Sequence, residues 1–195
     1  MIVLGLVDSK PSAAAILRDG EIVAAIAEER LCRMKLAGGM PRAAIAQVMA
    51  IAGVTASDID SVAVAQRVSI FEPEPIPFRG WFGADEQLKR GKLDQLSSIL
   101  APKLGRFPLA WKAHHSLKRF LSRERLKQIP TLLSDVYGIS APVHFYDHHY
   151  CHATAAYYTS NLDRALVVTL DGGGDGRSGS VYVGEYGHLR ELVSV

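Results

Sequence analysis

Apolar residues occur along the chain in short runs that end at glycine, proline or charged residues. Runs of this length are typical of buried or half-buried strands rather than of helices. We therefore expect strands over residues 2–7, 12–18, 21–27, 61–66, 143–146, 165–170, 180–185 and 189–195. Asp19 and Gly20 join the second and third runs, and this pair favours a two-residue hairpin because both positions need positive φ. A helix over 12–18 is the alternative, since that segment is rich in alanine.

Apolar side chains recur at helical spacing between several of these strands. Pro41 suits the first turn of one helix and Gly53 suits its end. Further helices are expected over residues 85–99, 109–128, 130–137 and 149–158. Residues 71–83 contain three prolines, which lack the backbone donor that helices and central strands need. This segment is therefore predicted to be a long loop that could cover a site.

The beginning and the end of the chain share one order of features. Each has an apolar strand, an aspartate, a turn of small residues, and two strands joined at a glycine; Asp8 corresponds to Asp171 and Gly20 to Gly187. Such a duplication predicts the α/β architecture of actin-like ATPases and sugar kinases, a ribonuclease H-like mixed sheet with flanking helices. We expect a first lobe over residues 1–160 and the incomplete beginning of a second lobe over 161–195.

The composition, with 48% hydrophobic and 22% charged residues, is that of an ordinary soluble globular protein. The net charge of +2 gives no reason to expect a polyanionic partner, so nucleic acid binding is not expected. Residues 101–130 nevertheless hold one acid and eight bases, which are Lys103, Arg106, Lys112, Lys118, Arg119, Arg123, Arg125 and Lys127. They form either a solvent-exposed helix face or a contact for a phosphate-bearing or acidic ligand.

Cellular location is inferred from the cysteines and from the absence of targeting signals. Cys32 and Cys151 are far apart and form no CxxC pair, which argues against a disulfide framework and favours a reducing compartment. The start of the sequence lacks the basic residues of a signal peptide, and no apolar run approaches the roughly 20 residues of a membrane span. We expect a cytoplasmic protein without a membrane partner.

Histidines cluster near residue 150, where four of the seven lie between His144 and His152. His148 and His152 have i, i+4 spacing, which on a helix places both rings on one face, as when two imidazoles bind one metal. Asp147 is a candidate third ligand or a hydrogen-bond partner of a ligand imidazole. His149 is an alternative partner for His152, and helix capping or core hydrogen bonding is the alternative to metal binding. A mixed nitrogen and oxygen site suits a divalent metal such as iron, zinc or manganese.

A glycine-rich segment follows the predicted strand at 165–170 and comprises Asp171, Gly172, Gly173, Gly174 and Asp175. The backbone N–H groups of such a turn can approach a phosphate closely, and a neighbouring carboxylate can hold the accompanying cation. The segment is therefore a candidate nucleotide-binding site. An ordinary hairpin turn is the alternative, because glycine and aspartate are common turn residues.

Three stretches together resemble the N-terminal domain of the O-carbamoyltransferases that act on nodulation factors and antibiotics. They are residues 28–35 with the glycines and proline of 38–41, residues 147–153, and residues 170–176. The resemblance implies that a C-terminal YrdC-like domain makes carbamoyl-adenylate from carbamoyl phosphate and ATP. The actin-like domain then transfers the carbamoyl group to a hydroxyl of a small molecule or sugar.

The resemblance also implies roles for particular residues. A metal, iron before zinc or manganese, is expected on His148 and His152, with the segment from Asp171 to Gly174 against the phosphate. Arg33 and Lys35 are expected to neutralise developing negative charge. Asp8, from the repeat, completes the set of candidate catalytic residues, and Ser12 is a further candidate contact of the nucleotide.

The sequence departs from the family pattern at two places. Ser9 and Lys10 replace the His-Asp or His-Asn pair, which includes the family's candidate general base, and Leu36 replaces a histidine. The missing second-lobe and YrdC-like regions would come from further sequence or from a separate chain. An actin-like sugar or acid kinase, a non-catalytic nucleotide-binding homologue and a tRNA threonylcarbamoyl-transfer protein are the alternatives.

Overall fold

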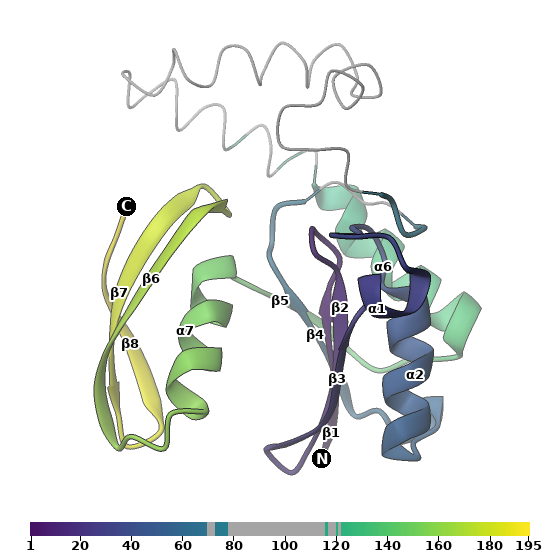
Figure 1. Cartoon of the computed structure of the whole chain (residues 1–195), viewed down its shortest axis with the longest axis horizontal. Helices are drawn as coiled ribbons and strands as arrows, with labels where there is room; N and C mark the ends of the chain where they lie inside the picture. The colour runs from purple at the N-terminus through teal and green to yellow at the C-terminus, as the bar shows by residue number, and fades with distance from the viewer. Residues whose placement is uncertain (70–72, 78–115, 117–119, 121) are drawn as a thin grey trace.

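Two β-sheets form the framework of the chain in the computed structural model, which describes residues 1–69, 73–77, 116, 120 and 122–195. The first sheet has the strand order β3-β2-β1-β4-β5, and the second has the order β6-β7-β8 (Figure 1). The helix predicted at 85–99, and most of the loop at 71–83 and of the helix at 109–128, lie outside the described residues.

The first sheet confirms five of the predicted strands. Strands β1 (Ile2–Val7), β2 (Ala13–Arg18) and β3 (Glu21–Ala27) form an antiparallel meander, so the alternative helix at 12–18 is wrong. Strands β4 (Ser61–Ala65) and β5 (Val143–Tyr146) then add in parallel beside β1. An antiparallel meander extended by parallel strands is the mixed sheet expected for the actin-like fold.

The second sheet repeats the meander with strands β6 (Arg164–Gly174), β7 (Arg177–Glu185) and β8 (His188–Ser194). Both meanders turn through two residues of positive φ. Asp19 and Gly20 have φ of 53° and 88°, and Tyr186 and Gly187 have φ of 47° and 82°. The matching turns confirm the internal duplication predicted from the positions of the glycines. Strand β6 is longer than predicted, and a register shift between Leu170 and Gly174 interrupts its pairing with β7.

Helices lie between the strands. Among the described residues they are α1 (Glu29–Cys32), α2 (Arg42–Ala52), the 3-10 helix η1 (Ala56–Asp58), α6 (Arg123–Tyr137) and α7 (His148–Tyr158). Gly53 ends α2 with φ of 62°, as predicted. The division of α6 at Pro130 was wrong, because the helix continues through it; proline there only leaves the carbonyl one turn earlier without its helical donor.

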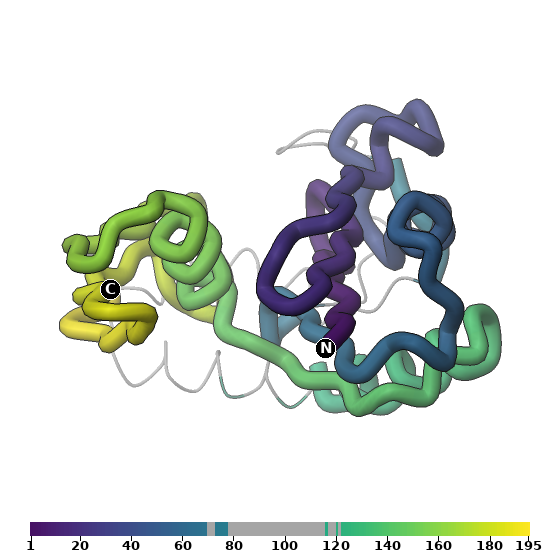
Figure 2. The backbone as a smooth tube through the Cα atoms, turned by 90° about the horizontal axis from the view of Figure 1, so that it is seen from below, coloured from purple at the N-terminus to yellow at the C-terminus, as the bar shows by residue number. Residues whose placement is uncertain are grey.

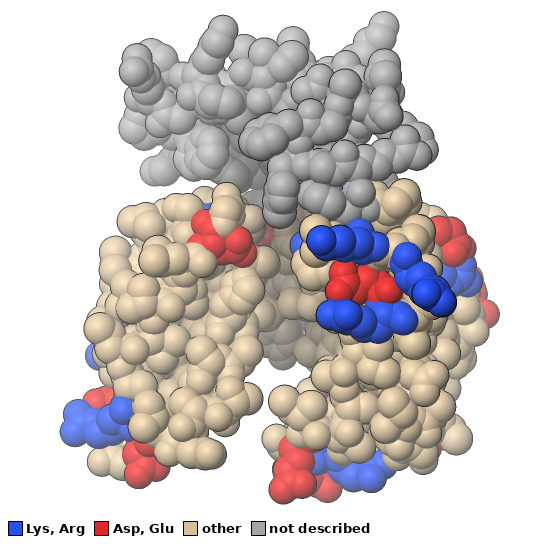
Figure 3. Space-filling model, in the orientation of Figure 1, with Lys and Arg blue, Asp and Glu red and all other residues tan. Residues whose placement is uncertain are grey.

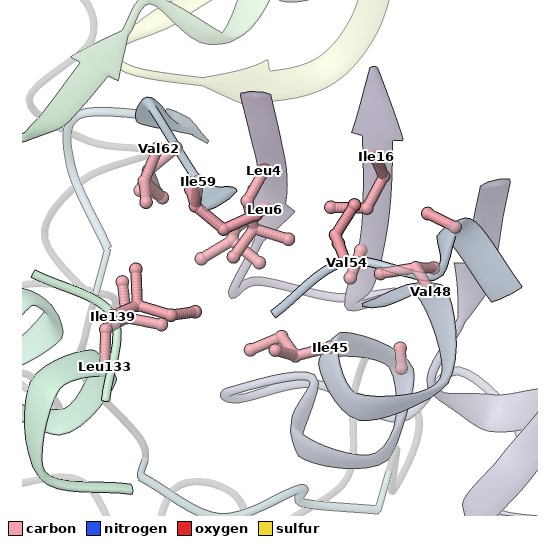
Figure 4. Close-up of a cluster of buried hydrophobic side chains, with 14 of the residues drawn as sticks. Leu4, Leu6, Ile16, Ile45, Val48, Val54, Ile59, Val62, Leu133 and Ile139 are labelled. Carbon is pink, nitrogen blue, oxygen red and sulfur yellow. The ribbon is translucent and has the colours of Figure 1, made fainter. Parts of the chain in front are cut away.

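The main hydrophobic core lies between the first sheet and helices α2 and α6. Leu4 and Leu6 from β1 are buried together with Ile45 from α2 and Leu133 from α6 (Figure 4). Alternate residues of β1 and β2 point to this side, which is the period-two pattern of a strand with one buried face.

Helix α7 packs against the second sheet rather than only closing the first lobe. Ala153 and Tyr157 from the helix share a second buried cluster with Val167 of β6 and Tyr182 of β7. Figure 2 shows α7 beside the second sheet, with one stretch of chain connecting this unit to the first. Helix α7, which was predicted from the sequence to belong to the first lobe, thus shares its buried cluster with strands of the second sheet.

An apolar cleft of about 480 Å³ separates α7 from the other face of the first sheet. Its walls consist mostly of small residues, such as Gly5, Ala15 and Ala63 from the sheet and Cys151 and Ala155 from the helix. The space-filling view shows the hollow between the two halves (Figure 3). Within the described part of the chain, no helix is long and apolar enough to cross a membrane.

Candidate metal centre

Helix α7 begins immediately after β5, and Asp147 is the residue that caps it. The Asp147 side chain accepts a hydrogen bond of 3.1 Å from the Tyr150 backbone N–H, which satisfies one of the free donors of the first turn. The same Oδ1 lies 3.8 Å from the guanidinium of Arg177. The structure thus gives Asp147 the role of a helix cap, in place of the metal-ligand role predicted for it.

The i, i+4 spacing brings the rings of His148 and His152 together on one side of α7. Their Nε2 atoms lie 3.0 Å apart. Oδ2 of Asp171, on β6, lies 2.6 Å from Nε2 of His148 and 3.3 Å from Nε2 of His152. The sequence placed Asp171 at a phosphate, but the fold makes it the third member of this cluster.

The three ligand atoms lie within 4.8 Å of one another. Neighbouring ligands of one ion bound at about 2.0–2.2 Å lie roughly 3 Å apart, so two imidazole nitrogens and a carboxylate oxygen at these distances fit a divalent metal. The side chains of His148, His152 and Asp171 are 20%, 53% and 39% exposed. Such exposure leaves room for a water or substrate oxygen as a further ligand, as in catalytic metal sites.

The charge of Asp171 is favoured by its surroundings. The hydrogen bond from His148 is the main cause that lowers the pKa of Asp171 to about 2, and the Gly172 backbone N–H contributes by donating to Oδ1 at 2.5 Å. The carboxylate is therefore ionised at neutral pH and can bind a cation.

The His149 ring lies edge-on to those of His148 and His152, with centroids 5.4 and 6.2 Å away, but its two nitrogens bond to groups of the protein interior. The residue is fully buried, with Nε2 3.1 Å from the Arg177 carbonyl oxygen and Nδ1 2.9 Å from Oγ1 of Thr169. Because a carbonyl can only accept, Nε2 carries a proton, while Nδ1 bonds to a threonine hydroxyl that also lies 3.3 Å from the Ser180 carbonyl oxygen. His149 is thus a core histidine, which decides against it as the alternative partner of His152.

Gly174 gives the His148 imidazole its space. A Cβ atom at Gly174 would overlap the His148 ring, whereas one at Gly172 would meet nothing within 4 Å. The last glycine of the predicted phosphate-binding segment therefore allows β6 to pass close to the metal cluster. Gly173 has φ of 138°, a conformation that favours glycine.

Asp175 is used to hold the backbone. Its carboxylate is 8% exposed and accepts from the backbone N–H groups of Arg67, Val68 and His148 at distances from 2.6 to 3.0 Å. The structure places it between the segment after β4 and the start of α7, rather than on an open nucleotide surface as predicted.

Asp8, predicted as a catalytic carboxylate, is paired with Arg125 in the structure. Nε of Arg125 donates to Oδ2 of Asp8 at 2.7 Å, and the NH2 group donates to Oδ1. The two residues are 3% and 1% exposed, so a buried pair between the residue that follows β1 and helix α6 replaces the open catalytic carboxylate that the repeat suggested. The burial of Arg125 also shows that this position of the basic run is not part of a solvent-exposed helix face.

Ser12 is fully buried, and both its backbone N–H and its hydroxyl donate to the Ala37 carbonyl, at 2.7 and 3.1 Å. It therefore fixes the loop after α1, where the sequence predicted a nucleotide contact. Arg33 and Lys35 lie on that loop with exposed side chains, so both cations are accessible to a ligand. Figure 3 shows basic side chains grouped around acidic ones over the part of the surface that α1 occupies.

Glu28 lies in the stretch 28–35 that carries the family resemblance, but no role of its own was predicted for it from the sequence. It is 1% exposed, and its carboxylate accepts from the backbone N–H groups of Ala43 and Ala44 at 3.1 and 2.8 Å. Glu28 thus caps α2 from a distant position. No local signal separates it from neighbouring Glu29, which is partly exposed and accepts from the Leu36 backbone N–H at 2.7 Å.

Comparison with known proteins gives a family match and several related sequences, of which two are described here. Residues 116–194 match the family described as "Carbamoyltransferase N-terminus". The chain is 30% identical over 185 residues to the nodulation protein NolNO of Sinorhizobium fredii, an alignment that covers 93% of this chain and 22% of that protein. It is also 28% identical over 179 residues to the uncharacterised protein sll1178 of Synechocystis sp.. That alignment covers 91% of this chain and 26% of that protein.

The chain thus spans about a quarter of the length of the curated relatives it matches. Two solved structures are also similar: YeaZ from Pseudomonas aeruginosa, and an uncharacterised protein with similarity to the peptidase YEAZ from Pseudomonas aeruginosa. Their TM-scores are 0.42 and 0.43, at sequence identities of 17% and 16%. Both alignments cover 99% of this chain, and they cover 65% and 64% of the respective solved chains. The sequence matches confirm the resemblance that the motifs predicted.

Proposed function

We propose that this chain, a carbamoyltransferase homologue that carries the N-terminal region of that family, is the metal- and nucleotide-binding part of an O-carbamoyltransferase. The observation that carries the proposal is the convergence of His148, His152 and Asp171 on one point. The histidines come from the motif that the family resemblance marks as its metal site, and the fold adds an ionised carboxylate to them.

The proposed reaction transfers a carbamoyl group from carbamoyl-adenylate, formed from carbamoyl phosphate and ATP, to a hydroxyl of a small molecule or sugar. The acceptor oxygen forms a bond to the carbamoyl carbon, and the bond from that carbon to the phosphate oxygen breaks. AMP leaves with the bonding electrons, and the hydroxyl proton passes to a base. The YrdC-like region that would make the adenylate is expected outside this chain.

His148, His152 and Asp171 would hold the metal, for which iron is the first expectation and zinc or manganese also suit the donor set. When bound, the metal would supply Lewis-acid stabilisation of negative charge on the carbonyl or phosphate oxygen. The chain's own residues orient this site: Asp147 fixes the first turn of α7, and Gly174 leaves space for the His148 ring.

Cations and backbone donors of this chain are proposed to bind the anionic part of the intermediate. The exposed side chains of Arg33 and Lys35 are available to compensate charge on the phosphate or the leaving group. The backbone at Gly172 and Gly173, next to Asp171, can approach an anion closely because it has no side chains.

Metal binding gives the first test. We expect the wild-type protein to bind one divalent ion, and His148→Ala, His152→Ala and Asp171→Asn each to weaken binding strongly. His144→Ala is the matched control, because His144 is an exposed histidine on β5 outside the cluster. Metal content that is equal in the wild type and the three cluster variants would refute the proposed centre.

Turnover of the natural full-length protein gives the second test. With carbamoyl phosphate, ATP and a hydroxyl acceptor, the proposal requires formation of AMP and of carbamoylated acceptor. A sugar or acid kinase would release ADP and phosphorylate its acceptor without need of the histidine pair. Formation of ADP in place of AMP would therefore support the kinase hypothesis and refute the carbamoyltransferase hypothesis.

One observation favours a second candidate, a nucleotide-binding homologue without transferase activity. Asp8 is neutralised by Arg125, and Ser9 and Lys10 stand where the family carries its candidate base. Such a homologue would bind ATP or AMP and metal, but would form no carbamoylated product with any acceptor. Product formation that depends on His148 would exclude it.

A further inference from the structure

Asp175 occupies a position between the two units of the fold. Its Oδ1 accepts from the Val68 backbone N–H at 2.6 Å and from the Arg67 N–H at 3.0 Å, and both donors belong to the segment that follows β4. Its Oδ2 accepts from the Arg67 N–H at 2.9 Å and from the backbone N–H of His148, the first residue of α7, also at 2.9 Å. One carboxylate therefore joins the end of β4 to the start of the metal-binding helix.

The segment from Gln66 to Val68 is held from its other side as well. Arg125 donates from NH1 to the Gln66 carbonyl at 2.7 Å and to the Arg67 carbonyl at 3.3 Å, while the rest of its guanidinium binds Asp8. A continuous set of charge-assisted hydrogen bonds thus runs from the first sheet through this segment to Asp175.

His148 links Asp175 to the metal cluster. Its backbone N–H bonds to Asp175, and its imidazole contacts both Asp171 and His152. Asp175 also lies only four residues after Asp171, directly beyond Gly174, against which the His148 ring packs. A shift of the Asp175 carboxylate would therefore move both the helical and the strand ligands of the cluster.

We propose that Asp175 is a positioning residue of the metal centre, and that it couples metal binding to the docking of the Gln66–Val68 segment. The inference rests on the metal site of the proposed function. Groups that orient metal ligands without touching the metal typically change affinity by about 10- to 100-fold when they are removed. Because coupling is reciprocal, metal bound at His148 and Asp171 must also stabilise the Gln66–Val68 segment in its docked position.

Every backbone partner of Asp175 is a donor, so both oxygens of its side chain must accept. In Asp175→Asn one oxygen becomes an NH2 group, which faces a backbone N–H whichever way the amide turns. At least one of the hydrogen bonds to Val68 or His148 is then lost at almost constant side-chain volume. Asp175→Asn therefore tests the hydrogen bonds rather than packing.

The experiment measures the affinity of the protein for zinc(II), in competition with a chromogenic chelator. We expect Asp175→Asn to raise the Kd by about 10- to 100-fold with one site retained. Glu28→Gln is the matched control, because Glu28 is another buried carboxylate that accepts from backbone N–H groups, and it lies outside the metal cluster. It should lower the melting temperature without changing the Kd.

A wild-type protein without zinc affinity would refute the proposed metal centre and this inference together. Wild-type affinity that persists unchanged in Asp175→Asn would overturn the inference alone. An equal loss of affinity in Glu28→Gln would also overturn it, because general destabilisation would then explain the effect.

Amide hydrogen exchange of the wild-type protein gives a readout that does not depend on a variant that folds. Zinc should slow exchange at Arg67 and Val68 by about tenfold. Exchange at Ala43 and Ala44, which donate to Glu28, should stay the same. Unchanged exchange at Arg67 and Val68 under saturating zinc would refute the coupling.

Discussion

Asp8 and Arg125 form a buried ion pair although 117 residues separate them in the sequence. Two hydrogen bonds join the carboxylate to the guanidinium, and the Arg125 side chain also lies over the Phe145 ring at 5.2 Å. The pair connects the end of β1 to helix α6, and so it fixes the N-terminal turn of the first unit. Removal of one partner would leave the other charge buried and uncompensated.

Arg125→Met should therefore lower the free energy of unfolding by about 3–5 kcal/mol. Lys127→Met is the control, because Lys127 is 79% exposed and its ion pair with Glu124, at 4.0 Å, is exposed as well. Its effect should stay within about 0.5 kcal/mol. Urea denaturation followed by circular dichroism measures both values. The double variant Asp8→Asn/Arg125→Met should recover part of the loss, since both charges are then absent. Equal midpoints for Arg125→Met and Lys127→Met would contradict the structural role of the pair.

Gly174 and Gly172 should differ in their tolerance of alanine. A methyl group at 174 would displace the His148 ring, so Gly174→Ala is expected to weaken metal binding at least about tenfold. A methyl group at 172 would extend into open space. Titration with zinc(II) measures both affinities, and Gly172→Ala should retain that of the wild type. Similar affinity in the two variants would show that the ring is not held against Gly174.

His149 and His152 are predicted to have opposite roles. His149→Leu removes two buried hydrogen bonds, so it should lower the free energy of unfolding of the metal-free protein by about 1–3 kcal/mol. His152→Leu changes an exposed side chain, and the unfolding energy of the metal-free protein should change by less than about 0.5 kcal/mol. Metal binding should follow the reverse order, with loss only in His152→Leu. The reverse result would assign the metal to His149.

Gly184 on β7 accommodates the ring of Tyr157, whose hydroxyl joins the Asp163 carbonyl and the Gly187 N–H at 2.9 and 3.1 Å. A Cβ atom at Gly184 would lie 2.5 Å from Cε2 of that ring. Gly184→Ala should therefore destabilise the second unit by about 1–3 kcal/mol. Gly5→Ala is the control, since its nearest contacts would be 3.8 and 3.9 Å, an ordinary distance. Thermal unfolding measures the stability of both variants. A melting temperature of Gly184→Ala equal to that of the wild type would contradict the close packing.

Much of the framework could be predicted because its signals are local. Every strand predicted between residues 2 and 66 and between 143 and 195 forms, since apolar alternation and turn glycines act over a few neighbouring residues. The Asp19–Gly20 hairpin is an example, because positive φ at both positions is a property of those residues themselves. Pro130 misled the prediction because core contacts of Ile129 and Leu133 on the same helix outweigh one missing hydrogen bond.

The roles of individual polar residues were harder to predict. Asp147, Asp171 and Asp175 are the same residue type within 29 positions of the sequence, yet one caps a helix, one joins the histidines and one binds backbone N–H groups of both units. Arg125 lies in a run of similar bases, and nothing near it in the sequence indicates burial.

The sequence by itself determined the duplicated meanders, the helix that carries the histidine pair and the family resemblance, because each depends on residues that are close along the chain. Only the tertiary structure decided which acid meets the histidines and which acids are occupied elsewhere. Those pairings depend on the crossing of α7 with β6 and on the contact of the β6–β7 turn with the segment after β4. Distances through space between remote segments are fixed by packing, and local spacing carries no information about them.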